Sequence, residues 1–362
     1  MKKIGILTWH YFSNFGSALQ AYALQTAIKK LGKDVQIINY CAPNSSSRKG
    51  KDDLRWCIGS VFGAFYHEGN SRFLYPAVRF RRKYMQLTNY CHSREMLAEV
   101  SAGFDAIVCG SDQIWAPNVF DPIYMLDFIS AQDVKKVSYA ASIGLRSIPE
   151  ELCCRYHDFL LPFHAISVRE EQGAALLAEK CSIAANVVLD PTFLPDRAEY
   201  DRLQRPLSDI KRPYVFCYFL NESNGYQDVV QAYAEKNGLE IVGFSRKTED
   251  AQWMRMKSYL GPEEFLWLID NAAAVFTDSY HGTIFSLLYH KEFFTFERFK
   301  KGDPVNQNSR IEQLNQWFGI SDRILYEGKD LAQCEPMDYT RFEQRLAEER
   351  THSLAYLKEA LS

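Results

Sequence analysis

A short apolar run that passes through a polar turn directly into a helix limits the fold of this chain more than any other feature. Residues 272–276 (AAAVF) are typical of a buried parallel strand, and the apolar positions within residues 284–288 have helical spacing. A strand that enters a helix at once places its turn at the carboxyl edge of a sheet, where open α/β sheets bind ligands. Residues 277–283 (TDSYHGT) are therefore a candidate site.

The side chains of this turn suit anion binding and proton transfer. The following helix presents backbone N–H groups, Gly282 lets an anion come close, and Thr283 offers a hydroxyl, so these two residues and Ser279 form a predicted phosphate-binding set. His281 is the predicted acid–base group, because an imidazole titrates near neutral pH. The alternative interpretation is a capped turn whose histidine only satisfies backbone groups.

Strand–helix alternation fills roughly the first 200 residues. Strands are predicted at residues 4–8, 35–40, 105–109, 136–142, 166–168 and 187–190, with helices at 19–31 and 173–180. Several strands end in a polar residue: Asp112, Ser142, Arg169 and Asp190. We expect these residues to line one cleft, because parallel strands present such ends at one edge. For Arg169 the alternative is an ion pair with Glu170 or Glu171.

Two loops of this half hold the other candidate residues. Asn14, Gly16 and Ser17 lie where a ligand would meet the N-terminus of the first helix, and a simple helix cap is the alternative. Asp112 could bind hydroxyl groups or serve only as an N-cap, and Gln113 beside it is assigned to the same cleft. The first loop lacks the G-x-G-x-x-G spacing, so it is not a dinucleotide fingerprint.

Residues 42–90 interrupt the alternation and read as an insertion that shapes a substrate cleft. They include a basic and aromatic cluster at residues 79–83 (RFRRK). Such a cluster on a helix indicates either peripheral contact with an anionic membrane surface or a solvated basic face.

The alternation stops between about Pro195 and Pro213, which reads as a linker, and then restarts. Strands are predicted at residues 214–219, 239–244, 272–276 and 293–296, and helices at 227–236, 261–269, 311–318 and 339–361. We therefore expect an α/β protein with two Rossmann-like domains that face a cleft, each a parallel sheet flanked by helices. The expected divisions are residues 1–200, residues 210–330 and a C-terminal helical segment, residues 331–362.

Composition narrows the functional class. The chain has 362 residues, is 47% hydrophobic and carries a net charge of −3, so no overall field favours nucleic acid. Its nine cysteines lack metal-site spacing and a disulfide pattern, which fits reduced thiols. With no apolar run of the ~20 residues that span a bilayer and no cleavable signal, we expect a cytoplasmic protein, at most bound to the inner face of the membrane.

Five motifs in order resemble the polysaccharide pyruvyl transferase family. They are residues 9–24 (W-x4-NFGS-x-LQ-x-YAL), 110–115 (GSDQIW), 167–170 (SVRE), 189–192 (LDPT) and 279–282 (SYHG). The resemblance covers most of the chain. It implies a glycosyltransferase-B-like pair of domains in which the N-terminal domain takes the acceptor and the C-terminal domain takes the donor.

The resemblance also implies an activity. The pyruvyl group of phosphoenolpyruvate would move onto two hydroxyls of a sugar, forming a cyclic ketal in bacterial exopolysaccharide or cell-envelope synthesis. His281 would serve in proton transfer, Arg169 would be the catalytic cation, and Asp112 would meet the acceptor. No metal or other cofactor is indicated, since phosphoenolpyruvate is a co-substrate and the acceptor is a glycan or a lipid-linked saccharide.

One position departs from the family pattern. Better-known members carry an arginine where this chain has Ser279, and Arg310 could supply that charge, with Arg298 and Lys301 as weaker candidates. Two other functions stay open at this point. The chain could be a glycosyltransferase of the same form that uses a nucleotide sugar, or a carbohydrate-binding relative without catalysis.

Overall fold

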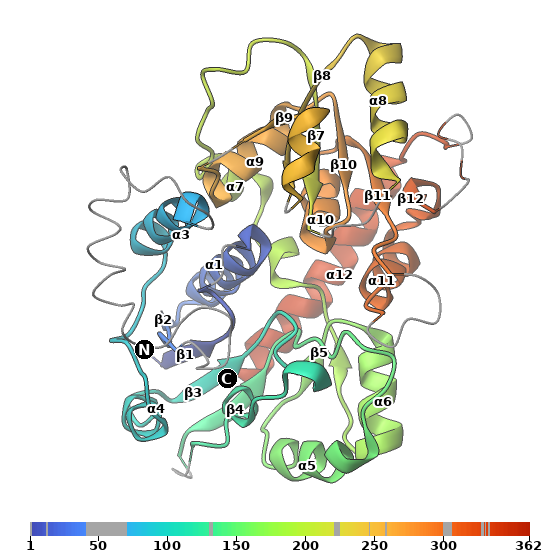
Figure 1. Ribbon diagram of the computed structural model, residues 1–362. Helices are drawn as coiled ribbons and strands as arrows, with labels where there is room; N and C mark the ends of the chain where they lie inside the picture. The colour runs from blue at the N-terminus through green and yellow to red at the C-terminus, as the bar shows by residue number, and fades with distance from the viewer. Residues whose placement is uncertain are drawn as a thin grey trace. The chain divides into compact units, whose positions relative to one another are not determined.

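The computed structural model describes residues 2–11, 14–40, 71–129, 133–220, 225–245, 247–257, 259–299, 306–326, 329, 331 and 334–362. The chain divides into two compact units (Figure 1). The first unit comprises Met1–Pro195 and Ala347–Ser362, and the second comprises Asp196–Leu346. Each unit contains a parallel sheet and helices, so the predicted α/β class is confirmed.

The first unit is built on a four-stranded parallel sheet of order β2-β1-β3-β4. Its strands are β1 (Lys3–Leu7), β2 (Asp34–Ile37), β3 (Ala106–Cys109) and β4 (Lys135–Ser138), beside a small pair β5 (Ser167–Val168) and β6 (Asn186–Val187). Its helices are α1 (Phe15–Lys30), α3 (Ser71–Tyr84), α4 (Arg94–Ser101), α5 (Glu150–Leu160) and α6 (Glu171–Cys181). The described part of this unit also contains the 3₁₀ turns η1 (Pro117–Val119), η2 (Pro122–Met125) and η3 (Pro191–Phe193). Because every residue of β3 is buried, this strand reads as a continuous apolar run.

The second unit has a six-stranded parallel sheet of order β12-β11-β10-β7-β8-β9. Its strands are β7 (Tyr214–Phe219), β8 (Glu240–Ser245), β9 (Arg255–Met256), β10 (Ala274–Thr277), β11 (Glu292–Phe296) and β12 (Ile324–Leu325). Its helices are α7 (Arg197–Asp201), α8 (Tyr226–Asn237), α9 (Pro262–Asn271), α10 (Tyr280–Leu288) and α11 (Ser309–Phe318), with 3₁₀ turns η4 (Thr248–Gln252) and η5 (Ser321–Arg323). β10 and α10 are the predicted strand and helix on either side of the histidine turn.

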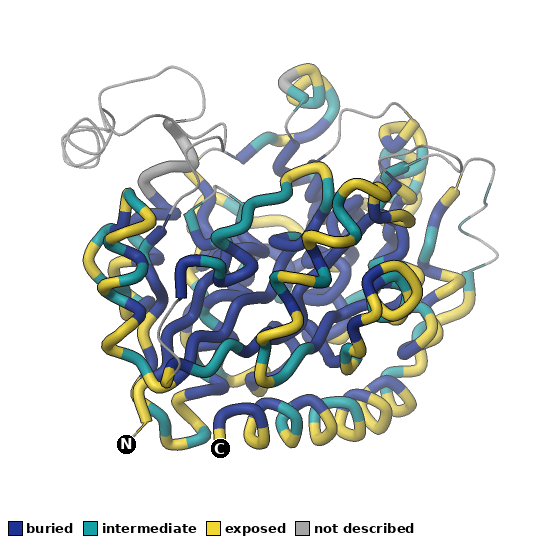
Figure 2. The backbone as a smooth tube through the Cα atoms, turned by 90° about the horizontal axis from the view of Figure 1, so that it is seen from below, coloured by how far each residue is buried: buried dark blue, intermediate teal, exposed yellow. Residues whose placement is uncertain are grey.

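The last helix, α12 (Tyr339–Ala360), begins in the second unit and ends in the first. Figure 2 shows buried and exposed residues alternating along it, as expected for an amphipathic helix. Its first-unit part is tied down by polar contacts. The Tyr356 hydroxyl donates to the Ser138 carbonyl at 2.9 Å, and the Leu189 N–H donates to the Ser353 hydroxyl at 2.9 Å.

The structure differs from the expected elements in several places, and three differences concern expected segments. The predicted linker contains α7, which forms part of the second unit. Strand β4 ends at Ser138, four residues earlier than expected, because the chain turns at Ala140 with φ 51°. Within the predicted insertion, residues 42–70 lie outside the described residues. Residues 71–84 form α3, and the segment after α3 continues alongside the end of β2 through a bridge between Tyr40 and Cys91.

The basic cluster on α3 does not form one exposed face. Arg81 is buried with 4% of its surface exposed, and its guanidinium carbon lies 4.5 Å from the centre of the Tyr11 ring. Arg79 is half-buried, and Arg82 and Lys83 are exposed. Arg81 packs inward because its stem and planar head group can cover an aromatic ring. Two exposed cations therefore remain from the four that the sequence placed on a basic face.

Candidate active site

In the first unit, the loop before α1 and the turn after β3 meet at the carboxyl edge of the sheet. Asn14 is the N-cap of α1, and its side-chain oxygen accepts a hydrogen bond from the Gly16 N–H at 3.0 Å. Ser17 is buried, and its hydroxyl donates to Asp112 Oδ2 at 2.5 Å. The helix-cap interpretation of Asn14 is therefore present in the structure, and Ser17 connects this loop to the predicted acidic residue.

Asp112 and Gln113 form the centre of this edge. Asp112 has φ 71°, and its Oδ1 accepts the Gln113 N–H at 2.9 Å. No helix begins at this turn, because the next helical element, η1, has Ala116 as its N-cap, so the N-cap alternative for Asp112 does not apply. The Gln113 side-chain nitrogen lies against Gly144. A Cβ there would be 2.4 Å from Nε2, and the φ of Gly144 is +66°, so glycine makes room for this amide.

Arg169 is fully buried in an ion network of the first unit. Its Nη1 lies 2.8 Å from Asp190 Oδ2 and its Nε lies 3.0 Å from Glu170 Oε1, which also accepts the Ser142 hydroxyl at 2.6 Å. The Ser142 N–H in turn donates to the Asp112 carbonyl at 2.9 Å. The four strand-end residues that the sequence predicted are thus brought together. Of the two interpretations of Arg169, the ion pair with Glu170 is present, with Asp190 as a second partner.

A further polar layer beneath these residues was not predicted. The Ser111 hydroxyl lies 3.3 Å from Asp190 Oδ2, and the Ser111 N–H donates to Gln20 Oε1 at 3.2 Å. The Gln20 amide in turn donates to the Thr8 hydroxyl at 2.9 Å. Thr8 and Ser111 each follow the end of a strand, and this position is the sequence feature from which they could have been predicted. These hydrogen bonds connect the turn after β3 to α1 and to the end of β1.

A buried histidine lies near the same edge. His10 Nδ1 is 3.0 Å from the Thr8 carbonyl, and its Nε2 is 3.4 Å from Asn39 Oδ1, which also accepts the Tyr11 hydroxyl at 2.6 Å. Burial, and secondarily the positive charge of Arg81, lower the pKa of His10 from 6.5 to about 4. His10 is therefore uncharged at physiological pH and serves as a neutral hydrogen-bonding group.

In the second unit, the turn between β10 and α10 is tightly packed. Ser279 caps α10 by accepting the Gly282 N–H at 3.3 Å. The sequence predicted that an anion would come close to Gly282. In the structure Thr277 takes this place, because a Cβ on Gly282 would lie 2.4 Å from Thr277 Oγ1. The Thr283 hydroxyl is 2.7 Å from that of Thr295 and 3.1 Å from the Ser279 carbonyl. These hydroxyls hold the turn in place.

His281 is part of a small cluster in the same unit. It is 5% exposed, and its ring centre is 5.2 Å from that of Tyr280 in an edge-on arrangement. The guanidinium carbon of Arg310 lies 5.6 Å from the Tyr280 ring centre. Gln307 orients this guanidinium by accepting hydrogen bonds at its side-chain oxygen (2.9 Å) and its carbonyl (3.3 Å). The structure thus brings Arg310 next to the histidine turn, and the contributions of Tyr280 and Gln307 were not predicted.

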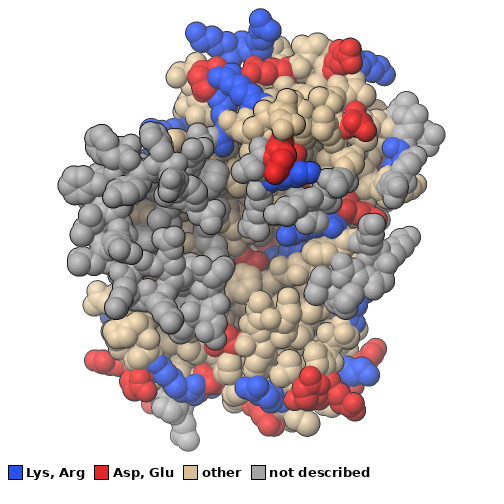
Figure 3. Space-filling view, viewed as in Figure 1, with Lys and Arg blue, Asp and Glu red and all other residues tan. Residues whose placement is uncertain are grey.

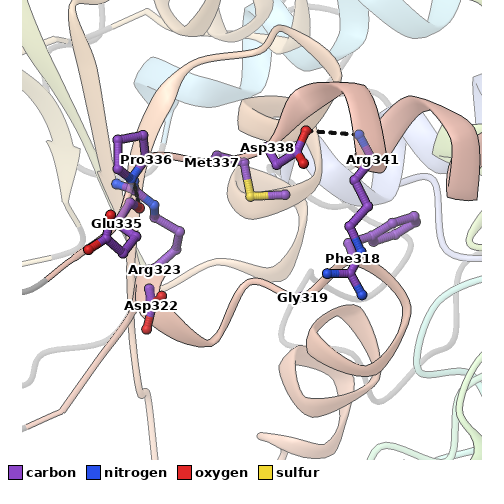
Figure 4. A pocket seen from close by; sticks show the side chains of 9 residues that line it. All are labelled: Phe318, Gly319, Asp322, Arg323, Glu335, Pro336, Met337, Asp338 and Arg341. Carbon is purple, nitrogen blue, oxygen red and sulfur yellow. Dashed lines mark hydrogen bonds between the residues drawn. The ribbon is translucent and has the colours of Figure 1, made fainter.

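A separate hollow of about 130 Å³ lies in the second unit, lined by residues from the end of α11 to the start of α12 (Figure 4). It contains Arg323, which is 2% exposed. The charge of Arg323 is already balanced, because its Nη1 lies 2.5 Å from Glu292 Oε1 and its Nη2 donates to the Glu335 carbonyl. None of the predicted site residues lines this hollow, so we do not assign the donor to it.

A sequence model of the polysaccharide pyruvyl transferase family matches residues 14–298, which include the first-unit site and the histidine turn, whereas Gln307 and Arg310 follow the matched residues. The chain belongs to the polysaccharide pyruvyl transferase family. It is therefore a transferase of the kind that the resemblance implied. No curated protein sequence matches it.

Solved structures with the same architecture are distant in sequence. A UDP-GlcNAc 2-epimerase from Neisseria meningitidis bound to UDP-GlcNAc has a TM-score of 0.50 at 11% identity, with 98% of this pyruvyl transferase chain and 94% of the epimerase covered. A putative UDP-N-acetylglucosamine 2-epimerase from Listeria monocytogenes has a TM-score of 0.51 at 11% identity, with 99% and 90% covered. A glycosyltransferase from Rickettsia africae has a TM-score of 0.51 at 11% identity, with 100% and 99% covered. At this identity the likeness shows the fold alone, and the fold of the pyruvyl transferase is glycosyltransferase-B-like.

Proposed function

We propose that this pyruvyl transferase moves the pyruvyl group of phosphoenolpyruvate onto two hydroxyls of one sugar, in a surface polysaccharide or its precursor. The family match supports the transferred group and a glycan acceptor. The observation that carries the proposal is the histidine turn of the second unit, where His281 and the oriented Arg310 both lie beside the Tyr280 ring, just after the carboxyl end of β10.

The donor chemistry fits the groups at this turn. Phosphoenolpyruvate carries a carboxylate and a phosphate, which favour a guanidinium with fixed geometry. Arg310 would bind one of these anions, with Gln307 keeping its head group in position. His281 would donate a proton to the methylene carbon, which becomes the methyl group and leaves the central carbon electrophilic. Ser279, Gly282 and Thr283 would fix the turn and the start of α10 around the donor.

The acceptor chemistry fits the first unit. Asp112 would accept the proton of an attacking hydroxyl, because each carboxylate oxygen can accept one hydrogen bond more than the one it receives from Ser17 or from the Gln113 N–H. Among the described residues, Gln113 Nε2 is buried without a hydrogen-bond partner, and we assign it to a second hydroxyl of the same sugar. Two new C–O bonds to the central carbon and release of phosphate complete the ketal. Asn14 and Gly16 would hold α1 and Ser17 in register for this step.

Arg169 would act through its neighbours in this scheme. Its guanidinium is fully buried and bridges Glu170 and Asp190, and Glu170 links it through Ser142 to the Asp112 carbonyl. The ion network would therefore position the turn that carries Asp112 and Gln113. A direct contact between Arg169 and a substrate would need the network to open.

Calorimetric titration with phosphoenolpyruvate, UDP-sugars and pyranosides tests the proposal. We expect phosphoenolpyruvate to bind to the protein. When an accepted sugar is also present, phosphate should be released and a new ketal methyl signal should appear in the proton NMR spectrum. Binding of a UDP-sugar without any binding of phosphoenolpyruvate would instead indicate a nucleotide-sugar glycosyltransferase. Binding of a sugar without turnover of any donor would indicate a carbohydrate-binding relative.

We further propose a cytoplasmic protein that contacts an anionic membrane surface through Arg82 and Lys83. In the described part of the chain, no helix has the length and apolar character to cross a bilayer. On the face in Figure 3, the described Lys and Arg side chains are intermixed with Asp and Glu, so any membrane contact would be local. Replacing both residues by Gln should remove low-salt binding to phosphatidylglycerol vesicles. Wild-type protein that binds such vesicles no better than phosphatidylcholine vesicles would contradict this proposal.

A further inference from the structure

Three cysteines of the first unit gather where α5 meets the end of α6. Cys153 and Cys154 lie in the first half of α5, and Cys181 is the last residue of α6. The two helices pack against each other (Figure 1). Cys153 is half-buried, Cys154 is exposed and Cys181 is buried, and all three are free thiols. The sequence had indicated reduced thiols and no pairing among them.

Cys153 and Cys181 lie at the contact between α5 and α6, whereas the neighbouring Cys154 is exposed. Residues four apart on a helix share a face, so Cys153 and His157 lie one above the other on α5. His157 Nδ1 is 2.8 Å from the Cys181 carbonyl, which places the Cys181 backbone against this face. Cys153 packs against the hydrophobic cluster that contains Cys181.

We propose that Cys153 and Cys181 are a redox modification site that a hydroperoxide converts into a reversible disulfide. The pair joins α5 to the end of α6, the helix that directly follows Arg169 and Glu170. This inference does not depend on the proposed transfer reaction.

The order of the two chemical steps follows from burial. Cys153 is accessible enough to meet a small peroxide, whereas Cys181 is 3% exposed and burial raises its pKa to about 11, so its thiol stays protonated. The deprotonated Cys153 sulfur would attack the peroxide, forming an S–O bond and breaking the O–O bond, to give a sulfenic acid and an alcohol or water. The Cys181 sulfur would then displace the sulfenic oxygen, and the thiol proton would leave with it as water. Two thiols are oxidised and one peroxide is reduced.

Peptide mapping of the full chain tests this site. Trypsin should release residues 147–155, with Cys153 and Cys154, and residues 181–197, with Cys181 at its first position. After treatment with hydrogen peroxide and alkylation of the remaining thiols, we expect these two peptides to be linked. The mass of the product should be two hydrogens below the sum of the peptides, plus one alkyl group on Cys154. Dithiothreitol should separate them, because thiol–disulfide exchange is reversible.

Two variants assign the link. Cys154→Ser is the matched control, because it lies one residue along the same helix, and the linked peptide should form to the wild-type extent. Cys153→Ser should lower the linked peptide at least tenfold. Mapping the wild-type protein keeps the test independent of how a variant folds. A link between Cys153 and Cys154, or peroxide-treated wild type in which Cys181 is still fully alkylated, would overturn the proposal.

Discussion

Replacing Arg169 by Gln should destabilise the first unit more than any exposed ion pair does. The guanidinium makes two charge-assisted contacts, 2.8 Å to Asp190 and 3.0 Å to Glu170, and all three side chains are at most 2% exposed. Removing the cation leaves two carboxylates buried without their partner. Breaking a buried pair in this way costs about 3–5 kcal/mol, which agrees with two charge-assisted hydrogen bonds of about 1.5–3 kcal/mol each.

Arg94→Gln is the matched control for this change. Arg94 also donates two hydrogen bonds, to the Asp127 carboxylate at 2.5 Å and to its carbonyl at 2.7 Å, but its side chain is 51% exposed. Solvent screening limits such a pair to about 0–1 kcal/mol. Urea unfolding followed by circular dichroism should therefore show a large loss of stability for Arg169→Gln and a small one for Arg94→Gln. Equal and small losses would refute the argument that burial makes Arg169 a structural cation.

Three further changes test other parts of the site. His281→Ala should lower turnover by roughly two to four orders of magnitude, while the affinity for phosphoenolpyruvate measured by calorimetry should change little. If turnover falls only a few-fold, the imidazole has a structural role and is not the acid–base group. Arg310→Gln should weaken phosphoenolpyruvate binding by about 1.5–3 kcal/mol, and Arg298→Gln should not; equal effects would remove Arg310 from the donor site. The pKa of His10 is about 4 in the folded chain and 6.5 in the unfolded chain, so the unfolded chain takes up a proton first as the pH falls. The free energy of unfolding should therefore decrease between pH 6.5 and about 4, by on the order of 3 kcal/mol. His10→Gln should flatten this part of the stability profile in urea titrations, and an unchanged profile would contradict the assignment.

Most of the fold was predictable because its strands are buried on both faces. Strands such as β7 and β10 are buried at every position and appear in the sequence as unbroken apolar runs between turns. Strands β9 and β12 have two residues each, so no periodicity can reveal them. The first turn of α5, which includes Glu150, has little apolar signal, and its packing is decided by tertiary contacts with α6.

The sequence predicted where the candidate site residues lie in the fold, but not which residues their side chains contact. A residue that follows a buried strand was correctly expected at the carboxyl edge, as Asp112 and Ser142 show. What each side chain contacts depends on residues far away in the sequence. Asp190, which balances Arg169, is 21 positions away, and Ser17, which holds Asp112, is 95 positions away. Spacing within one element carries no information about such pairs.

The helix α12 has a consequence for how the chain is made. The first unit contains residues 1–195 and 347–362, so its last part is synthesised after all of residues 196–346. At ~5–20 residues per second the delay is on the order of 10–30 s. During that time the Leu189 N–H lacks the Ser353 hydroxyl and the Ser138 carbonyl lacks the Tyr356 hydroxyl. The unit that begins first on the ribosome is therefore completed last, and a fragment that stops at residue 195 should not reach the native packing of its own sheet.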